Sequence, residues 1–154
     1  MAWGRNGKFA AEVERVYQAG EEIIREGELG SEMYIIQRGQ VAVFKLIGEL
    51  EVKLAVLGKG HFFGEMSLLE GLPRSATVRA LEPTSVLVLA PGGFLVRIRR
   101  DPTLAFELLQ QLSNRIRRLN DQLAESMLGN AQSVDAVSLS IARSEFDAAR
   151  NSRQ

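Results

Sequence analysis

The sequence predicts a mainly β domain followed by a long C-terminal helix. From residue 14 to 91, short apolar and β-branched runs alternate with glycine-centred turns, as in "MYIIQRG", "VAVFKLIG" and "SVLVLAPGG". This pattern is typical of an all-β fold. From Asp101 onward the apolar spacing becomes helical. With 154 residues, 45% of them hydrophobic, the chain can bury one substantial core. We therefore expect one barrel, jelly roll or sandwich with appendages.

The composition excludes several classes of function. Nineteen basic residues balance nineteen acidic ones, so no net charge attracts the chain to nucleic acid or to an anionic membrane. The absence of cysteine excludes disulfides and thiolate chemistry and fits a reducing compartment. The N-terminal "MAWGRNGKFAAEV" lacks the apolar run of a signal peptide or a spanning helix. We expect a soluble, cytoplasmic protein without a membrane partner.

The chain divides by periodicity into a short N-terminal segment at 1–13, a domain at 14–128 and a tail at 129–154. Within the domain, we expect the β-roll at about 14–91 and helices at about 92–128. In "GQVAVFKL" the side chains of Val41 and Val43 fall on one face of a strand and those of Ala42 and Phe44 on the other. This alternation predicts a strand with one face toward the core.

The helical part has its own start, seam and end. Asp101 is a plausible N-cap, and Pro102 suits the first helical position because its missing N–H costs nothing there. An apolar seam follows at spacings of three and four, formed by Leu109, Leu112, Ile116, Leu119 and Leu123. Gly129 is expected to end the helix. The tail at 129–154 is expected to be partly helical or disordered.

The stretch "FFGEMSLLEGLPRSATVRA" at 62–80 places charged residues in an apolar setting. One interpretation is a structural ion pair between Glu65 and Arg74. The other is a ligand site. Gly64 lets a backbone approach a ligand, a short helix starting near Met66 offers free N–H groups, and Arg74 can hold phosphate oxygens. With a carboxylate beside it to accept from a hydroxyl, the implied ligand carries one anion and one hydroxyl.

Two stretches carry a resemblance to a known family. "FFGEMSLLEGLPRSATV" resembles the phosphate-binding cassette of cyclic nucleotide-binding domains, as in the catabolite activator protein, kinase regulatory subunits and cyclic-nucleotide-gated channels. "GEEIIREGELGSEMYIIQRGQVAVF" resembles the early strands of the same family, and the likeness covers about residues 14–125. It implies a jelly-roll β-roll with a phosphate-binding cassette helix and a long C-terminal helix acting as a lid.

The resemblance assigns roles within the cassette. It implies that Glu65 accepts a hydrogen bond from the ribose 2′-hydroxyl and that Arg74 pairs with the cyclic phosphate. The rest of the phosphate shell is implied to come from main-chain N–H groups and one hydroxyl, at Gly64, Met66, Ser67 and Ser75.

Outside the cassette, the resemblance implies contacts from the barrel and from the long helix. The barrel side chains expected near sugar and base are Val43, Leu54 and Ala55. Each reads equally well as an ordinary core residue. The helix residues expected near the purine are Arg115, Leu119 and Asn120. A solvated helix surface is the alternative for these three.

We therefore predict a receptor and not an enzyme: a stand-alone sensor, whole or cut from something larger, that binds cyclic AMP and signals through movement of the C-terminal helix. In the family that the chain resembles, a threonine after the cassette arginine often accompanies a preference for cyclic GMP, whereas serine and alanine occur in cyclic AMP binders. The resemblance therefore implies cyclic AMP from Ser75, with cyclic GMP as the alternative. No cofactor or metal is expected. The residues beyond Gly129 are too few for a DNA-binding domain, since a domain takes about 50 residues or more. The protein effector is unknown. A homodimer through the 109–123 helix is as plausible as packing of that seam on the barrel.

Two other classes of function compete with the receptor. A cupin-like metalloenzyme on a similar β-roll would use His61 and Glu65, but the chain has one histidine where such a site needs two or three. We expect His61 to be a turn residue instead. The second alternative is an interaction module that no longer binds a ligand, against which the intact Glu65 and Arg74 argue.

Overall fold

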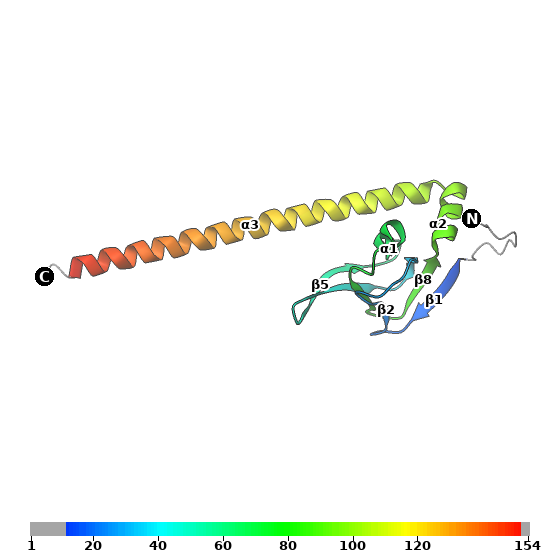
Figure 1. The fold of residues 1–154 in the computed structure, drawn as a ribbon, viewed down its shortest axis with the longest axis horizontal. Helices are drawn as coiled ribbons and strands as arrows, with labels where there is room; N and C mark the ends of the chain where they lie inside the picture. Colours follow the sequence, from blue (N-terminus) through cyan, green and yellow to red (C-terminus); the bar gives the residue numbers. More distant parts are fainter. Residues whose placement is uncertain (1–11, 152–154) are drawn as a thin grey trace. The chain divides into compact units, whose positions relative to one another are not determined.

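Two four-stranded antiparallel sheets form the β-roll expected at 14–91, and together they make a β sandwich (Figure 1). The computed structural model describes residues 12–151. One sheet has the strand order β1-β8-β3-β6 and the other β2-β7-β4-β5. The strands are β1 (Val13–Tyr17), β2 (Glu22–Ile24), β3 (Met33–Arg38), β4 (Val41–Ile47), β5 (Leu50–Leu57), β6 (Phe62–Phe63), β7 (Thr77–Ala80) and β8 (Thr84–Leu89).

Val41 and Val43, which the alternation of β4 predicts on one face, both belong to the core, and Ala42 of the other face is fully buried as well. Val41 is fully buried in the core, and Val43 packs against it from the same face. On the neighbouring strand, Val43 pairs with Ala55, after which the register shifts so that Phe44 pairs with Lys53. This bulge leaves Leu54 out of the pairing, which local alternation alone does not predict.

The core lies between the two sheets and combines residues from six strands. Its buried members are Tyr34, Ile36, Val41, Leu57, Phe63, Val78, Val86 and Val88. Because β-branched and aromatic side chains fill both inner faces, burial of this cluster is the main stabilising term for the fold.

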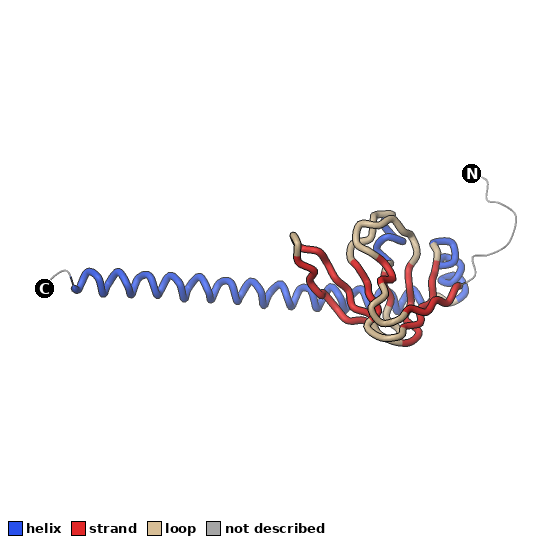
Figure 2. Tube along the Cα trace, turned by 90° about the horizontal axis from the view of Figure 1, so that it is seen from below, coloured by secondary structure: helices blue, strands red, loops and turns tan. Residues whose placement is uncertain are grey.

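Three helices follow or interrupt the strands, and they are blue in Figure 2. The first is α1 (Glu65–Glu70), which begins one residue before the predicted start at Met66. The second is α2 (Pro91–Arg100), with its proline in the first turn. The third is α3 (Thr103–Asn151). Helix α3 begins at Thr103, so the prediction that Pro102 takes its first position is wrong by one residue. The Asp101 side chain still satisfies a main-chain donor at this end, because its Oδ1 accepts a hydrogen bond from the Thr103 N–H at 3.1 Å.

The prediction that Gly129 ends the helix is wrong. Helix α3 continues through Gly129 to Asn151, so the tail predicted at 129–154 is helical as far as the structure describes it. A glycine ends a helix when it adopts a left-handed conformation, and Gly129 is not among the glycines with positive φ. Within a helix, glycine costs only about 1 kcal/mol relative to alanine, and good helix formers flank this one on both sides.

The chain divides into two units at the boundary between Leu108 and Leu109, which falls within α3. All eight strands, with α1 and α2, belong to the N-terminal unit. Of the N-terminal segment predicted at 1–13, residues 1–11 lie outside the described part, as do residues 152–154 of the tail. Among the helices of the described residues, none is long and apolar enough to cross a membrane.

Candidate functional site

The cassette is a strand–helix–turn–strand unit whose two glycines set its geometry. After β6, Gly64 turns the chain with φ of 79° and serves as N-cap of α1; Gly71 ends the helix with φ of 68°, and its N–H bonds to the Ser67 carbonyl. A Cβ at Gly64 would lie 2.9 Å from the Glu32 carbonyl oxygen. Only glycine suits this position, for its conformation and for its space.

Arg74 is the central side chain of the cassette, and it is only 5% exposed. Its main chain is clamped to the loop after β2, because its N–H donates to the Glu28 carbonyl at 2.9 Å and its own carbonyl accepts from the Gly27 N–H at 2.8 Å. These two hydrogen bonds therefore fix the position of the Arg74 main chain, from which the guanidinium extends.

The Arg74 guanidinium is held by three hydrogen bonds. Its Nη1 donates to the carbonyl oxygens of Glu32 at 2.8 Å and of Gly64 at 3.1 Å. Its Nη2 lies 3.3 Å from Oε2 of Glu32, which makes Glu32 its ion-pair partner. The alternative prediction of a structural ion pair joined Arg74 to Glu65. The carboxylate that pairs with Arg74 belongs instead to Glu32, the residue before β3 and 42 residues away in the chain.

Two further residues pack against this guanidinium. A Cβ at Gly30 would lie 2.7 Å from Nη2 and 2.8 Å from Nε, closer than real Cβ contacts. The ring of Tyr34 has its centroid 5.8 Å from Cζ of Arg74 and stacks on Phe63 at 5.0 Å. Burial raises the pKa of Tyr34, so its phenol stays neutral. The Arg74 guanidinium is therefore held in one position by its hydrogen bonds and by the Tyr34 ring.

The remaining cassette residues surround the start of α1. Glu65 and Ser67 are buried, at 7% and 3% exposure, whereas Met66 is exposed. The N–H groups of the first helical turn have no carbonyl partner within the helix. The hydroxyl of Ser75 lies 3.4 Å from the Met66 sulfur. The fold therefore brings the six predicted cassette residues to one corner of the sandwich.

The three predicted barrel residues do not share one environment. Val43 and Ala55 are register partners that pack against the core. Leu54 lies at the bulge and is 50% exposed. Their role beside a ligand stays a prediction.

The three predicted purine contacts, at Arg115, Leu119 and Asn120, lie in the C-terminal unit, which begins at Leu109. Leu119 is 63% exposed. Their proposed role at the base also stays a prediction.

Sequence reasoning missed Glu32, Gly30 and Tyr34. All three stand in the quoted stretch "GEEIIREGELGSEMYIIQRGQVAVF", but nothing local marks them as neighbours of Arg74. His61 was predicted correctly as a turn residue: its Nδ1 accepts a hydrogen bond from the Gly58 N–H at 3.1 Å. In residues 12–151 no three metal-ligating side chains come together, so the cupin-like alternative finds no support there.

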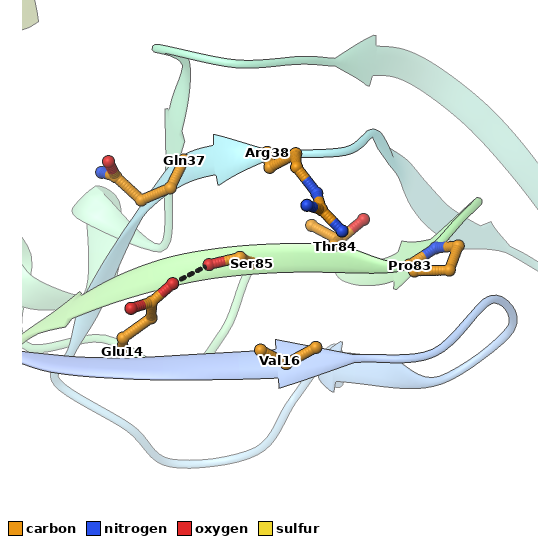
Figure 3. Close-up of a pocket in the computed structure, with 7 residues that line it drawn as sticks. All are labelled: Glu14, Val16, Gln37, Arg38, Pro83, Thr84 and Ser85. Carbon is orange, nitrogen blue, oxygen red and sulfur yellow. Dashed lines mark hydrogen bonds between the residues drawn. The ribbon is translucent and has the colours of Figure 1, made fainter.

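Two surface hollows are lined by residues other than the six predicted cassette residues. One, of about 250 Å³, is lined by Glu14, Val16, Gln37, Arg38, Pro83, Thr84 and Ser85 (Figure 3). These residues come mostly from β1, β3 and β8, whose main-chain groups pair within the sheet, and Glu14 accepts from Ser85. The other, of about 480 Å³, is lined by three glutamates and one arginine among its eight residues. The three glutamates of the second hollow are paired with Arg25, Lys45 and Arg79, so the nearby cations already have carboxylate partners.

Comparisons with known proteins agree with the cassette. The family described as "Cyclic nucleotide-binding domain" matches residues 14–101. The chain is 40% identical over 110 residues to a cyclic AMP receptor protein of Thermus thermophilus, covering 71% of this chain and 51% of that protein. It is 41% identical over 101 residues to a cyclic GMP-dependent protein kinase of Eimeria tenella, covering 66% of this chain and 9% of the kinase.

A solved structure shows the same architecture. The crystal structure of the Thermus thermophilus catabolite activator protein superposes with a TM-score of 0.65 at 39% identity, covering 73% of this chain and 53% of that one. The chain spans about half the length or less of these relatives. The family match, the shared two-sheet fold and the cassette built around Arg74 lead to one conclusion: this chain belongs to the cyclic nucleotide-binding domain family.

Proposed function

We propose that the chain is a cyclic nucleotide receptor in which Arg74 binds the cyclic phosphate and Glu65 accepts the ribose 2′-hydroxyl. The observation that carries this proposal is Arg74 itself: a buried guanidinium, oriented by two main-chain carbonyls beside the first turn of α1. Holding a cation in place before the ligand arrives removes an ordering cost from binding. The N–H groups near Gly64, Met66 and Ser67 complete the phosphate shell in this proposal.

Cyclic AMP is the proposed ligand. Ser75 supports it by the family pattern, and one relative is named for cyclic AMP. Another relative is named for cyclic GMP, which keeps cyclic GMP as the competing ligand. Calorimetric titration of the purified protein with both nucleotides, after any bound nucleotide has been removed, tests the proposal. We expect one site per chain with tighter binding of cyclic AMP; failure of both nucleotides to saturate the protein would contradict the receptor role.

The proposed output is a change in the position of helix α3. A ligand shifts a conformational equilibrium only to the extent that it binds one state better than the other. Contacts of the base with Arg115, Leu119 and Asn120 would supply that difference. Deleting the chain from Asn114 onward should leave a folded sandwich that binds more weakly, because phosphate and ribose contacts remain while the base loses its cover. Equal affinity of the truncated and full-length proteins would remove the lid role.

A second part of the proposal concerns pairing of two copies through α3. The predicted seam at 109–123 continues along the helix with large exposed apolar side chains, at Met127, Val134, Val137 and Ile141. A helix with an apolar stripe buries it against another element, and a stripe of this length fits the same stripe of a second copy. No catalytic role is proposed; the effector would read the pairing or the movement of α3.

A further inference from the structure

The Arg74 guanidinium is already shared with a carboxylate. Both Nη1 hydrogens go to the carbonyls of Glu32 and Gly64, and one Nη2 hydrogen goes to Oε2 of Glu32. Of the five N–H donors of an arginine side chain, the one on Nε and the second on Nη2 have no hydrogen bond to residues 12–151. A phosphate must therefore use donors that lie beside the Glu32 carboxylate.

We infer that Glu32 makes this site selective for phosphate monoanions over phosphate dianions. The class of ligand favoured is the phosphodiester, of which a cyclic nucleotide is one example; the class rejected is the phosphomonoester, such as adenosine 5′-monophosphate. The inference rests on the proposed phosphate role of Arg74 and adds to it a residue that is not part of the cassette.

The charges around the guanidinium explain the selectivity. Arg74 contributes one positive charge, and the Glu32 carboxylate is paired with its Nη2. A phosphodiester brings one negative charge, whereas a phosphomonoester brings about 1.5 to 2 because its second pKa is about 6. The Glu32 side chain is 40% exposed, so water screens the added repulsion without removing it.

The size of the effect follows from Coulomb's law. A guanidinium is a small group, so an oxyanion bound to its free donors lies about 5 Å from a carboxylate that contacts Nη2. At that distance one additional negative charge weakens binding by roughly 4-fold at the dielectric constant of water and by roughly 250-fold at that of a protein surface. Because the Glu32 side chain is 40% exposed, we expect a factor near the aqueous end of this range, roughly 5- to 15-fold. Removing the Glu32 charge should therefore strengthen the binding of a phosphate dianion by that factor relative to the binding of a monoanion.

The test uses the full-length variant Glu32→Gln and three ligands: cyclic AMP, adenosine 5′-monophosphate and the methyl ester of adenosine 5′-monophosphate. The last two have the same base, sugar and open-chain phosphate and differ in charge. The glutamine oxygen can still accept from Nη2, and the Glu32 main chain is unchanged. Glu28→Gln is the matched control, because its side chain contacts Arg25 and not the guanidinium of Arg74.

In wild-type protein and in Glu28→Gln, the methyl ester should bind more tightly than the monophosphate near neutral pH. In Glu32→Gln this preference should shrink by roughly 5- to 15-fold, with cyclic AMP binding retained. An unchanged preference would overturn the inference while leaving the receptor function intact, and loss of cyclic AMP binding in Glu32→Gln would show that Glu32 orients Arg74 and does not select charge. Absence of cyclic nucleotide binding in wild-type protein would instead overturn the proposed function itself.

Discussion

Gly30 and Arg74 are packed so closely that a methyl group on Gly30 would lie 2.7 Å from Nη2 of Arg74. The backbone at Gly30 does not have a positive φ, so glycine is needed there for space and not for conformation. The main chain of Gly30 thus forms one wall of the slot that holds the guanidinium.

Gly30→Ala should therefore displace the Arg74 guanidinium and weaken nucleotide binding. If one charge-assisted hydrogen bond to the phosphate is lost, the cost is about 1.5–3 kcal/mol, or roughly 10- to 150-fold in affinity. Gly58→Ala is the control, since a Cβ at Gly58 meets no atom within 4 Å and its φ is not positive. Calorimetric titration of both variants with cyclic AMP checks this. Equal affinities would mean that Arg74 does not need its observed position.

The fold was predictable because its signals are local. Strand alternation, the glycine at the start of the cassette helix and the Asp101 cap each depend on residues within one or two turns of each other. The largest local error was Gly129, where the residue type suggested a helix end that the backbone does not make.

The surroundings of Arg74 were not predictable for the opposite reason. Glu32 is 42 residues away in the chain, and it lies near the guanidinium because the Arg74 main chain is bonded to the loop after β2 and β3 lies beside β6, the strand before Gly64. Any of several glutamates has the right chemistry, so only the register of the strands identifies this one. Leu54 shows the same limit: a single bulge in the pairing of β4 with β5 changes its surroundings.

Removing Arg74 should affect both stability and binding. In Arg74→Ala the carbonyls of Glu32 and Gly64 lose their donor inside the protein, which should lower the free energy of unfolding by about 1–3 kcal/mol. The stabilisation that cyclic AMP gives the wild-type protein should disappear. Arg99→Ala is a control, because Arg99 lies at an exposed position on α2 and its loss should change neither quantity much. Thermal unfolding with and without nucleotide checks both, and a ligand-induced shift of wild-type size in Arg74→Ala would exclude the phosphate role.

Arg79 pairs with the carboxylates of Glu22 and Glu51 in the sheet β2-β7-β4-β5. These pairs should make the free energy of unfolding depend on pH. Hydrogen bonds from Arg25 and then Arg79 hold the pKa of Glu22 below its ordinary 4.5, and a hydrogen bond from Arg79 does the same to the pKa of Glu51. A carboxylate with a lowered pKa in the folded state adds stability above its unfolded pKa. That contribution is lost as the pH falls through the folded-state value.

Arg79→Gln should therefore lower the melting temperature most near neutral pH, and the difference from wild type should narrow as the pH falls below 4.5. A part of the difference that does not change with pH is expected, because Arg79 also lies 4.7 Å over the Phe44 ring. Arg99→Gln, which removes the same charge from an exposed position on α2, should show no such narrowing. A difference for Arg79→Gln that stays constant from neutral to acid pH would contradict the linkage.

The exposed apolar stripe of α3 should pair two copies of the chain. Ile141 is 53% exposed and shares one helix face with Val134 and Val137, since the three are spaced by three and four residues. Burying an isoleucine side chain is worth about 1.5–3 kcal/mol, and in a parallel pair both copies lose it. Ile141→Glu would in addition place two like charges opposite each other. We expect the dimer dissociation constant to rise by roughly 100-fold or more, measured by sedimentation equilibrium.

Gln132→Glu introduces the same charge on the opposite face of the helix and should leave the dimer intact. Both variants should still bind cyclic AMP, because neither residue is among the proposed contacts with the nucleotide. If wild-type protein and Ile141→Glu sediment alike, the stripe does not pair two copies, and another element must cover it.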